Sequence, residues 1–263
     1  MLESDPVLEV RGLCVRHAAR EGGRPSRAAL ADVNLQLGAG EMVGLVGESG
    51  SGKSTLVRAV ARLLPAEAGE VRVLGLNWLR LHGRALREQR RHLQLVFQDP
   101  LASLNPRMSV GEALSEPLRA FHPRMGAPER REAVAVMLER VGLSAADASR
   151  YPRLFSGGQC QRIAIARAMI AKPRILICDE PVSSLDVSIR GQILNLLLDL
   201  QRDAGTSMLF ISHDLAVVRH LCRRTYVLLA GRIVDEGPTA ELFARPHHPY
   251  TLELLAAAPR LGG

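Results

Sequence analysis

A glycine-rich segment with one lysine is the part of the chain best suited to phosphate chemistry. Residues 47–55 read Gly-Glu-Ser-Gly-Ser-Gly-Lys-Ser-Thr, after an apolar run and before a helical pattern, as a phosphate-binding loop requires. Glycines let backbone N–H groups approach phosphate oxygens, because no Cβ intervenes. A flexible Gly/Ser turn is the alternative. The pattern predicts that a nucleoside triphosphate is bound by Gly47, Glu48, Ser49, Gly50, Ser51, Gly52, Lys53, Ser54 and Thr55.

Lysine is almost absent outside this loop. The chain has 34 lysines and arginines together, and only Lys53 and Lys172 are lysines. A lysine in a chain that otherwise uses arginine indicates a site that needs a compact point charge. We expect Lys53 to reach the β- and γ-phosphates and to act in catalysis, and the Ser54 hydroxyl to bind Mg²⁺.

Two carboxylates follow a second apolar run. Residues 175–180 read Ile-Leu-Ile-Cys-Asp-Glu, and Pro181 comes next. At a strand end, Asp179 is placed to hold Mg²⁺ through water, and Glu180 to orient or deprotonate the attacking water. The two acids could instead cap the next helix, but their pairing and Pro181 argue against that. The pair predicts hydrolysis of the bound triphosphate.

A second glycine turn lies between these two motifs. Residues 155–162 read Phe-Ser-Gly-Gly-Gln-Cys-Gln-Arg, which alone would be an ordinary helix start. Such a turn offers further backbone N–H groups to a γ-phosphate. Because a nucleotide already held by the first loop does not need them, we expect the turn to serve a nucleotide held by another subunit. Its residues are Ser156, Gly157, Gly158 and Gln159.

In this order the motifs resemble those of the ATP-binding cassette family, the ABC ATPases, along nearly the whole chain. Gln98 stands where the Q-loop glutamine of that family falls, and residues 184–186 (Ser-Leu-Asp) resemble the D-loop. His213, within Ile-Ser-His-Asp, resembles the switch histidine. A lone histidine would more often be structural, but in this register a catalytic role is favoured.

The resemblance implies how the motifs cooperate. Two cassettes would sandwich two ATP molecules, each between one subunit's phosphate loop and the other's turn at 156–159, with Asp186 among the nucleotide-binding residues. His213 would contact the γ-phosphate and position Glu180. Gln98 would sense Mg²⁺ and the lytic water and link them to motion of a helical subdomain. Loss of the γ-phosphate would open the dimer.

Two positions depart from the family pattern. The residue that stacks on adenine is usually aromatic, and here that position is His17; an imidazole stacks more weakly, and an ordinary surface histidine is the alternative. Cys160 stands where a polar or basic residue is common. A helix N-terminus can lower a thiol pKa, so we hypothesise that Cys160 is reactive.

The composition is that of a globular protein. Its 263 residues are 47% hydrophobic, which is enough for a substantial core. No apolar run reaches the roughly 18 residues of a membrane span, and the first residues lack a signal-peptide pattern. A net charge of +7 could indicate nucleic acid, but the arginines are scattered and aromatics are 3%, so no nucleic-acid partner is expected. The four cysteines form no Cys-x-x-Cys pair and are expected to be reduced.

Strands that alternate with helices predict an α/β fold. Together with the motifs, they indicate a P-loop NTPase cassette with a mainly parallel core sheet, an N-terminal antiparallel β subdomain and an inserted α-helical subdomain. We expect the core to span 1–98 and 156–240, the helical insertion 99–155, and a tail 241–263. Strands are expected over 7–17, 28–37, 41–46, 71–74, 93–97, 175–179, 207–211, 225–229 and 232–236, and helices over 56–64, 129–141, 159–170, 188–204 and 215–222.

Three segments, 96–107, 179–186 and 246–255, are similar to ATPases of dipeptide, oligopeptide and nickel importers. The resemblance implies an ATP-hydrolysing translocase subunit that energises uptake of peptides, nickel or a metallophore. No Cys-rich extension follows Pro259, so the chain resembles the second, shorter ATPase of such systems. His247 and His248 lie between prolines and are expected on a surface loop rather than in a metal site.

The resemblance also implies partners and a location. These are a second ABC ATPase subunit in a hetero- or homodimer, two integral-membrane permeases and an extracytoplasmic substrate-binding protein, with the chain peripheral at the cytoplasmic face of the bacterial inner membrane. A soluble ABC ATPase acting on ribosomes or DNA is an alternative, although the chain has one cassette and no coiled-coil insertion. A regulatory module without turnover fits the intact Asp179, Glu180 and His213 less well. The cargo and the direction of transport stay open.

Overall fold

The computed structural model describes residues 5–16 and 28–257, which form two compact units. Unit 1 comprises Met1–His82 and Ser207–Gly263, and unit 2 comprises Gly83–Thr206. Unit 2 therefore contains the expected helical insertion together with the elements that flank it, and the finer division into four segments stays a prediction. No helix in the described part of the chain is both long and apolar enough to span a membrane.

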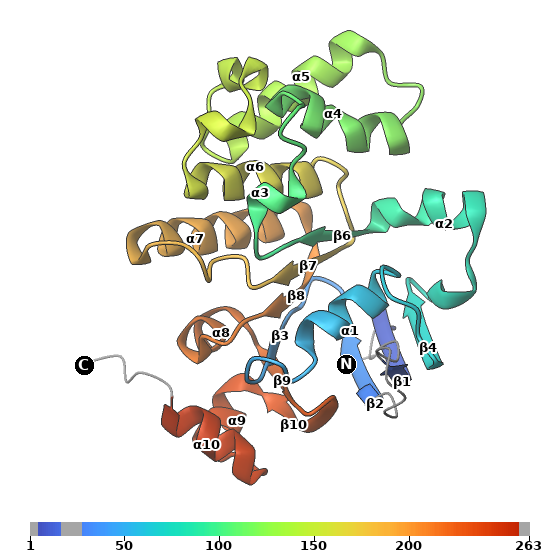
Figure 1. Cartoon of the computed structure of the whole chain (residues 1–263), viewed down its shortest axis with the longest axis vertical. Coiled ribbons are helices and arrows are strands. Elements are labelled where there is room, and N and C mark those ends of the chain that lie inside the picture. The colour runs from blue at the N-terminus through green and yellow to red at the C-terminus, as the bar shows by residue number, and fades with distance from the viewer. Residues whose placement is uncertain (1–4, 17–27, 258–263) are drawn as a thin grey trace, which may run out of the picture. The chain divides into compact units, whose positions relative to one another are not determined.

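An antiparallel sheet forms the N-terminal part of unit 1 (Figure 1). Its strand order is β2-β1-β4-β5. Every second residue of the last part of β2 is buried, including Leu35 and Leu37, so one face of the sheet is apolar. Helix α1 (Lys53–Val60) contacts β1 and β2. The strands are β1 (Leu8–Arg16), β2 (Ala28–Leu37), β4 (Ala68–Val73) and β5 (Leu76–Asn77), followed by the 3-10 helix η1 (Trp78–Arg80).

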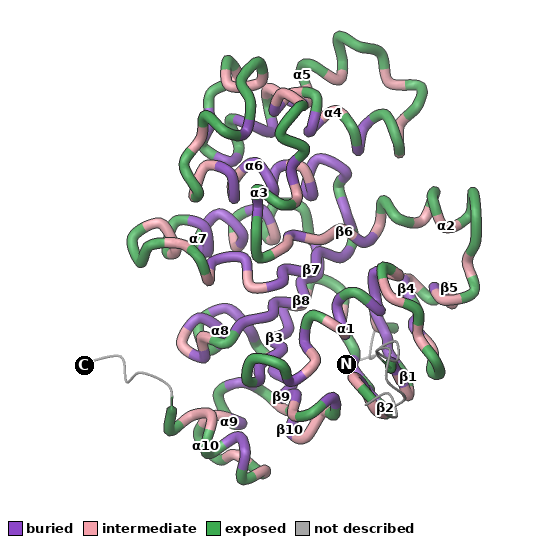
Figure 2. The backbone as a smooth tube through the Cα atoms, in the orientation of Figure 1, coloured by how far each residue is buried: buried purple, intermediate pink, exposed green. Residues whose placement is uncertain are grey.

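The other strands of unit 1 run in the order β10-β9-β3-β8. β3 pairs in parallel with β8 and β9, while β10 is antiparallel to β9. Every residue of β3 and β8 is buried (Figure 2), as expected for parallel strands covered on both faces. The strands are β3 (Met42–Val46), β8 (Ser207–Ile211), β9 (Arg224–Leu229) and β10 (Arg232–Pro238), with helices α8 (Leu215–Leu221), α9 (Thr239–Ala244) and α10 (Pro249–Ala257).

Unit 2 is mostly helical around one pair of parallel strands, β6 (Leu93–Val96) and β7 (Ile175–Asp179). α6 (Gly157–Met169) is its central helix, because it contacts β6 and the helices α3, α4, α5 and α7. The other helices are α2 (Gly83–Gln89), η2 (Arg90–His92), α3 (Pro100–Ser103), α4 (Val110–Phe121), α5 (Ala127–Arg140), η3 (Ala145–Ser149), η4 (Pro152–Leu154) and α7 (Val187–Ala204).

The end of α1 differs from the sequence-based expectation. We expected a helix to Leu64, closed by Pro65, but α1 ends at Val60. Arg62 adopts a left-handed φ of 57°, and the N–H groups of Leu63 and Leu64 turn back to the carbonyl of Arg58. Because this turn already satisfies carbonyls at the helix end, the helix stops before the proline.

Candidate functional site

The glycine-rich loop connects the buried strand β3 to α1 (Figure 1). Gly47 and Gly52 have φ values of 152° and 113°, which side-chain-bearing residues rarely adopt. A Cβ on Gly47 would lie 2.2 Å from the carbonyl oxygen of Leu228. Backbone conformation and close packing therefore both require glycine here.

The loop folds around the ammonium group of Lys53. This side chain is 6% exposed, and its Nζ donates hydrogen bonds to the carbonyls of Gly47, at 2.7 Å, and Glu48, at 2.8 Å. The N–H of Gly231 donates to the Ser51 carbonyl at 2.8 Å. The cation and the loop backbone are thus positioned together.

Three features of the loop fit a phosphate group. The buried hydroxyl of Ser51 has no hydrogen-bond partner within the described residues, and a phosphate oxygen would supply one. The first turn of α1 has no acidic residue, and the helix N-terminus adds partial positive charge. Ser54 is exposed in that turn, and a hydroxyl together with carboxylate and phosphate oxygens is the donor set that Mg²⁺ prefers.

Unit 1 also brings His213 to the edge of the sheet that carries the loop. β3 and β8 run in parallel with Leu45 opposite Ile211, so Gly47 and His213 each lie two residues beyond that pair. His213 is exposed. Its neighbour Asp214 caps α8 through backbone N–H groups of Ala216 and Val217, and this cap fixes the turn that presents the imidazole.

In unit 2, Gln98 and the acid pair Asp179 and Glu180 lie at the carboxyl ends of two neighbouring parallel strands. β6 and β7 run in parallel with Val96 opposite Cys178, so Gln98 and Glu180 each lie two residues beyond that pair. Asp179 is 7% exposed, whereas Gln98 is exposed and Glu180 half-buried. Glu180 has a φ of 49°, a strained conformation for a residue with a side chain and one that clusters at functional sites.

The second glycine turn forms a reciprocal helix cap. The Ser156 hydroxyl accepts the Gln159 N–H at 3.3 Å, and the Gln159 side chain accepts the Ser156 N–H at 3.0 Å. A Cβ on Gly158 would lie 2.6 Å from Cγ2 of Ile189, so the turn packs against the first residues of α7. Asp186 is the N-cap residue of α7. Unit 2 therefore brings the expected signature turn and D-loop together.

One sequence-based hypothesis is wrong and another is untested. Cys160 is completely buried, and burial raises the pKa of its thiol. A buried thiol resists ionisation and is closed to reagents, so Cys160 is not an activated thiol. His17, the expected adenine-stacking residue, lies outside the described residues.

Sequence reasoning missed a tyrosine that contacts the loop. The N–H of Glu48 donates to the Tyr250 hydroxyl at 2.8 Å, although the two residues are 202 positions apart. Tyr250 is one of three tyrosines in the chain and lies within the segment 246–255 that resembles importer ATPases, but neither signal indicates a contact with the phosphate loop. His247 and His248 lie in the loop before α10, as expected.

Comparison with known proteins identifies the family. A family model described as "ABC transporter" matches residues 30–183. The oligopeptide transport ATP-binding protein OppF of Salmonella typhimurium is 48% identical over 259 residues, which cover 96% of this chain and 78% of the relative. The glutathione import ATP-binding protein GsiA of Escherichia coli is 50% identical over 263 residues, which cover 98% of this chain and 42% of GsiA.

Solved structures agree. A dimeric ATP-binding cassette in a post-hydrolysis state, bound to ADP and Pi, has a TM-score of 0.78 and 29% identity, covering 88% of this chain and 98% of that one. The cassette cbiO1 from Clostridium perfringens has a TM-score of 0.78 and 27% identity, covering 92% of each chain. Because the family model matches over half of the 263 residues and the OppF match covers nearly all of them, the chain belongs to the ABC transporter family, as one of its ATPase cassettes.

Proposed function

We propose that the chain is the ATP-hydrolysing subunit of a peptide importer, peripheral at the cytoplasmic face of the bacterial inner membrane. The observation that carries this proposal is the 48% identity to OppF over 96% of the chain, since OppF is named for oligopeptide transport. GsiA, named for import of the tripeptide glutathione, supports the same cargo class. Two permeases, a second ATPase subunit and an extracytoplasmic substrate-binding protein are the proposed partners. Nickel or a metallophore is the alternative cargo.

In this proposal the glycine-rich loop binds the β- and γ-phosphates of ATP. Lys53 supplies the point charge, and the N–H groups of the first turn of α1 supply partial positive charge. Ser54, Gln98 and Asp179 would hold Mg²⁺, through water in the case of Asp179. When bound, Mg²⁺ neutralises charge on the phosphate oxygens.

Glu180 is the proposed general base. It orients a water molecule and takes its proton while the water oxygen bonds to the γ-phosphorus and the bond to the bridging oxygen breaks. The products are ADP and phosphate. His213 contacts the γ-phosphate. The strained backbone at Glu180 supports this role, because strain kept at one residue implies a requirement for that orientation.

A second cassette completes each site in this proposal. Residues 156–159 of one subunit bind the γ-phosphate held by the other, with Asp186 nearby. The exposure of Ser156 and Gly157 and the dimeric form of the similar cassette bound to ADP and Pi support this arrangement. Closing around ATP and opening after phosphate loss would drive the permeases between two states.

The catalytic assignment is tested by comparing Glu180→Gln with Lys53→Ala in the complex with the partner subunits. Glu180→Gln should lower kcat at least about 100-fold, because a general base contributes that much or more, and should leave Mg-ATP binding intact. Lys53→Ala should weaken the binding of Mg-ATP. Glu241→Gln, at an exposed position of α9, is the control. Unchanged turnover in Glu180→Gln would reject Glu180 as the base.

The transport assignment needs a separate measurement. The tagged chain should co-purify with permeases, and vesicles containing the complex should take up labelled peptide when ATP is supplied on the cassette side. Co-purification with ribosomes or DNA instead, without permeases, would reject the transport assignment. Uptake of nickel but not peptide would correct the cargo alone.

A further inference from the structure

Helix α10 carries a side chain that contacts the phosphate loop. The hydroxyl of Tyr250, in the first turn of α10, accepts the N–H of Glu48 at 2.8 Å. Tyr250 is 6% exposed, whereas residues 48–50 of the loop are exposed. Packing therefore fixes the tyrosine, whose hydroxyl holds the N–H group at the start of the exposed residues 48–50.

The residue that Tyr250 holds is also the one that positions the lysine. The carbonyl of Glu48 accepts hydrogen bonds from Lys53 Nζ at 2.8 Å and from the Ser51 N–H at 3.2 Å. Glu48 thus links two side chains: its N–H contacts the Tyr250 hydroxyl, and its carbonyl contacts the Lys53 ammonium group. A shift of Glu48 would move an acceptor that directs Lys53.

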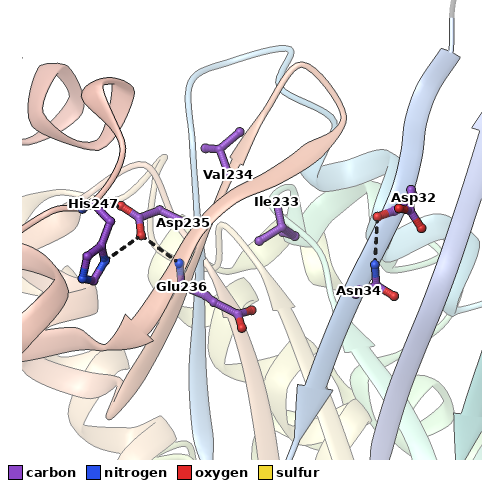
Figure 3. A pocket seen from close by; sticks show the side chains of 7 residues that line it. All are labelled: Asp32, Asn34, Ile233, Val234, Asp235, Glu236 and His247. Carbon is purple, nitrogen blue, oxygen red and sulfur yellow. Dashed lines mark hydrogen bonds and ion pairs between the residues drawn. The ribbon is translucent and has the colours of Figure 1, made fainter.

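A buried carboxylate anchors the start of α10. Asp235 of β10 is 6% exposed and accepts the N–H groups of His247, at 3.1 Å, and His248, at 3.0 Å, and the Thr251 hydroxyl at 2.8 Å. Nδ1 of His247 lies 3.2 Å from Oδ1 of the same carboxylate, and Figure 3 shows the ring beside it. Because Tyr250 directly precedes Thr251, this cluster of hydrogen bonds sets where its ring lies.

We propose that Tyr250 is a positioning residue for nucleotide binding: its hydroxyl, held in place through Asp235, keeps Glu48 where its carbonyl directs Lys53 at the phosphates. The inference rests on the proposed role of the loop in binding ATP. Without the hydroxyl, the exposed loop residues sample more conformations in the free protein. ATP binding must then supply the ordering, which weakens affinity. Chemistry in the bound state changes little, because the loop is ordered once ATP is present.

Tyr250→Phe tests this directly, because it removes the hydroxyl and keeps the ring. Tyr226→Phe is a matched control. The Tyr226 hydroxyl also accepts a backbone N–H, from Gln36 at 3.1 Å, as well as a hydrogen bond from Arg224, and the residue is 3% exposed. Neither of these donors belongs to the phosphate loop.

Titration with Mg-ATP and steady-state kinetics on the intact complex give the readout. Tyr250→Phe should weaken Mg-ATP binding and raise KM about 3- to 10-fold, the size expected for one net hydrogen bond, with kcat within about twofold of wild type. Tyr226→Phe should bind as wild type. Asp235→Asn should also weaken Mg-ATP binding. The double variant Asp235→Asn/Tyr250→Phe should lose less binding free energy than the sum of the losses in the two single variants.

Lys53→Ala in the same titration separates the positioning role of Tyr250 from the proposed role of the loop in binding ATP. If Lys53→Ala loses binding while Tyr250→Phe binds as wild type, the positioning role is overturned and the proposed function stands. If Tyr226→Phe weakens Mg-ATP binding as much as Tyr250→Phe does, the positioning role is also overturned, because the effect is then a general destabilisation of the fold. If Lys53→Ala binds Mg-ATP normally, the loop does not act as proposed and both claims fail.

Discussion

Gly157 and Gly158, at the start of α6, differ in how closely they are packed. A Cβ on Gly158 would lie 2.6 Å from Cγ2 of Ile189, whereas one on Gly157 would lie at an ordinary 3.8 Å from Cδ2 of Leu185. Gly158 therefore serves the packing of α6 against α7. Gly157, which is exposed, is left to the proposed contact with a partner's nucleotide.

Gly158→Ala should destabilise the fold by about 1–3 kcal/mol, because overpacking forces neighbours to shift. Thermal unfolding should show a lower Tm. Gly157→Ala is the matched control and should unfold close to wild type, even where it impairs turnover in the assembled dimer. Equal losses of Tm in the two variants would contradict this difference between the glycines.

The local motifs could be predicted at the residue scale because their chemistry lies in contiguous residues. The run 47–55 contains its own glycines, lysine and hydroxyls, and Asp179 and Glu180 follow one apolar strand. The contact of Tyr250 with Glu48 could not be predicted, because it joins residues 202 positions apart. The burial of Cys160 was missed for a related reason: it depends on the helices that surround α6.

At the scale of elements, the buried strands were the most predictable. β7 and β8 have the bounds expected from the sequence, 175–179 and 207–211. Each consists of an apolar run with one polar residue at an end and is completely buried, and a continuous apolar run is the signal for such a strand. The end of α1 was mispredicted because the left-handed turn at Arg62 has no glycine or proline to mark it. α10 depends on its anchor at Asp235, which lies in another element.

That anchor predicts a dependence of stability on pH. Burial alone would raise the pKa of Asp235, but hydrogen bonds from Thr251, His248 and His247 outweigh it and hold the pKa below its ordinary 3.8. A carboxyl with a lowered folded-state pKa stabilises the fold above its ordinary pKa, and this stabilisation is lost as pH falls through the folded-state value. The contribution should therefore be complete at pH 7 and decline below about pH 4.

Denaturant unfolding at two pH values checks this. The free energy of unfolding of Asp235→Asn should lie below that of wild type at pH 7, and the difference should shrink at pH 3. Glu236→Gln, at the exposed neighbouring position, should differ little from wild type at either pH. A deficit in Asp235→Asn that is the same at both pH values would show that the carboxylate charge is not what anchors α10.

At the scale of the whole molecule, we propose that one chain holds only part of each active site. The phosphate loop and His213 lie in unit 1, and the acid pair and the 156–159 turn lie in unit 2. In this proposal the turn serves a nucleotide held by another subunit. The sequence contains the motifs for both parts of such a site, but it does not show whether the 156–159 turn acts in its own chain's site or in that of a partner.

The most direct test measures ATP turnover per chain and molecular mass by light scattering in the same samples, across a concentration series, with and without a partner cassette. Turnover should follow the fraction of chains in dimers, and monomeric samples should be inactive. Turnover at the full rate in samples that remain monomeric would contradict the account.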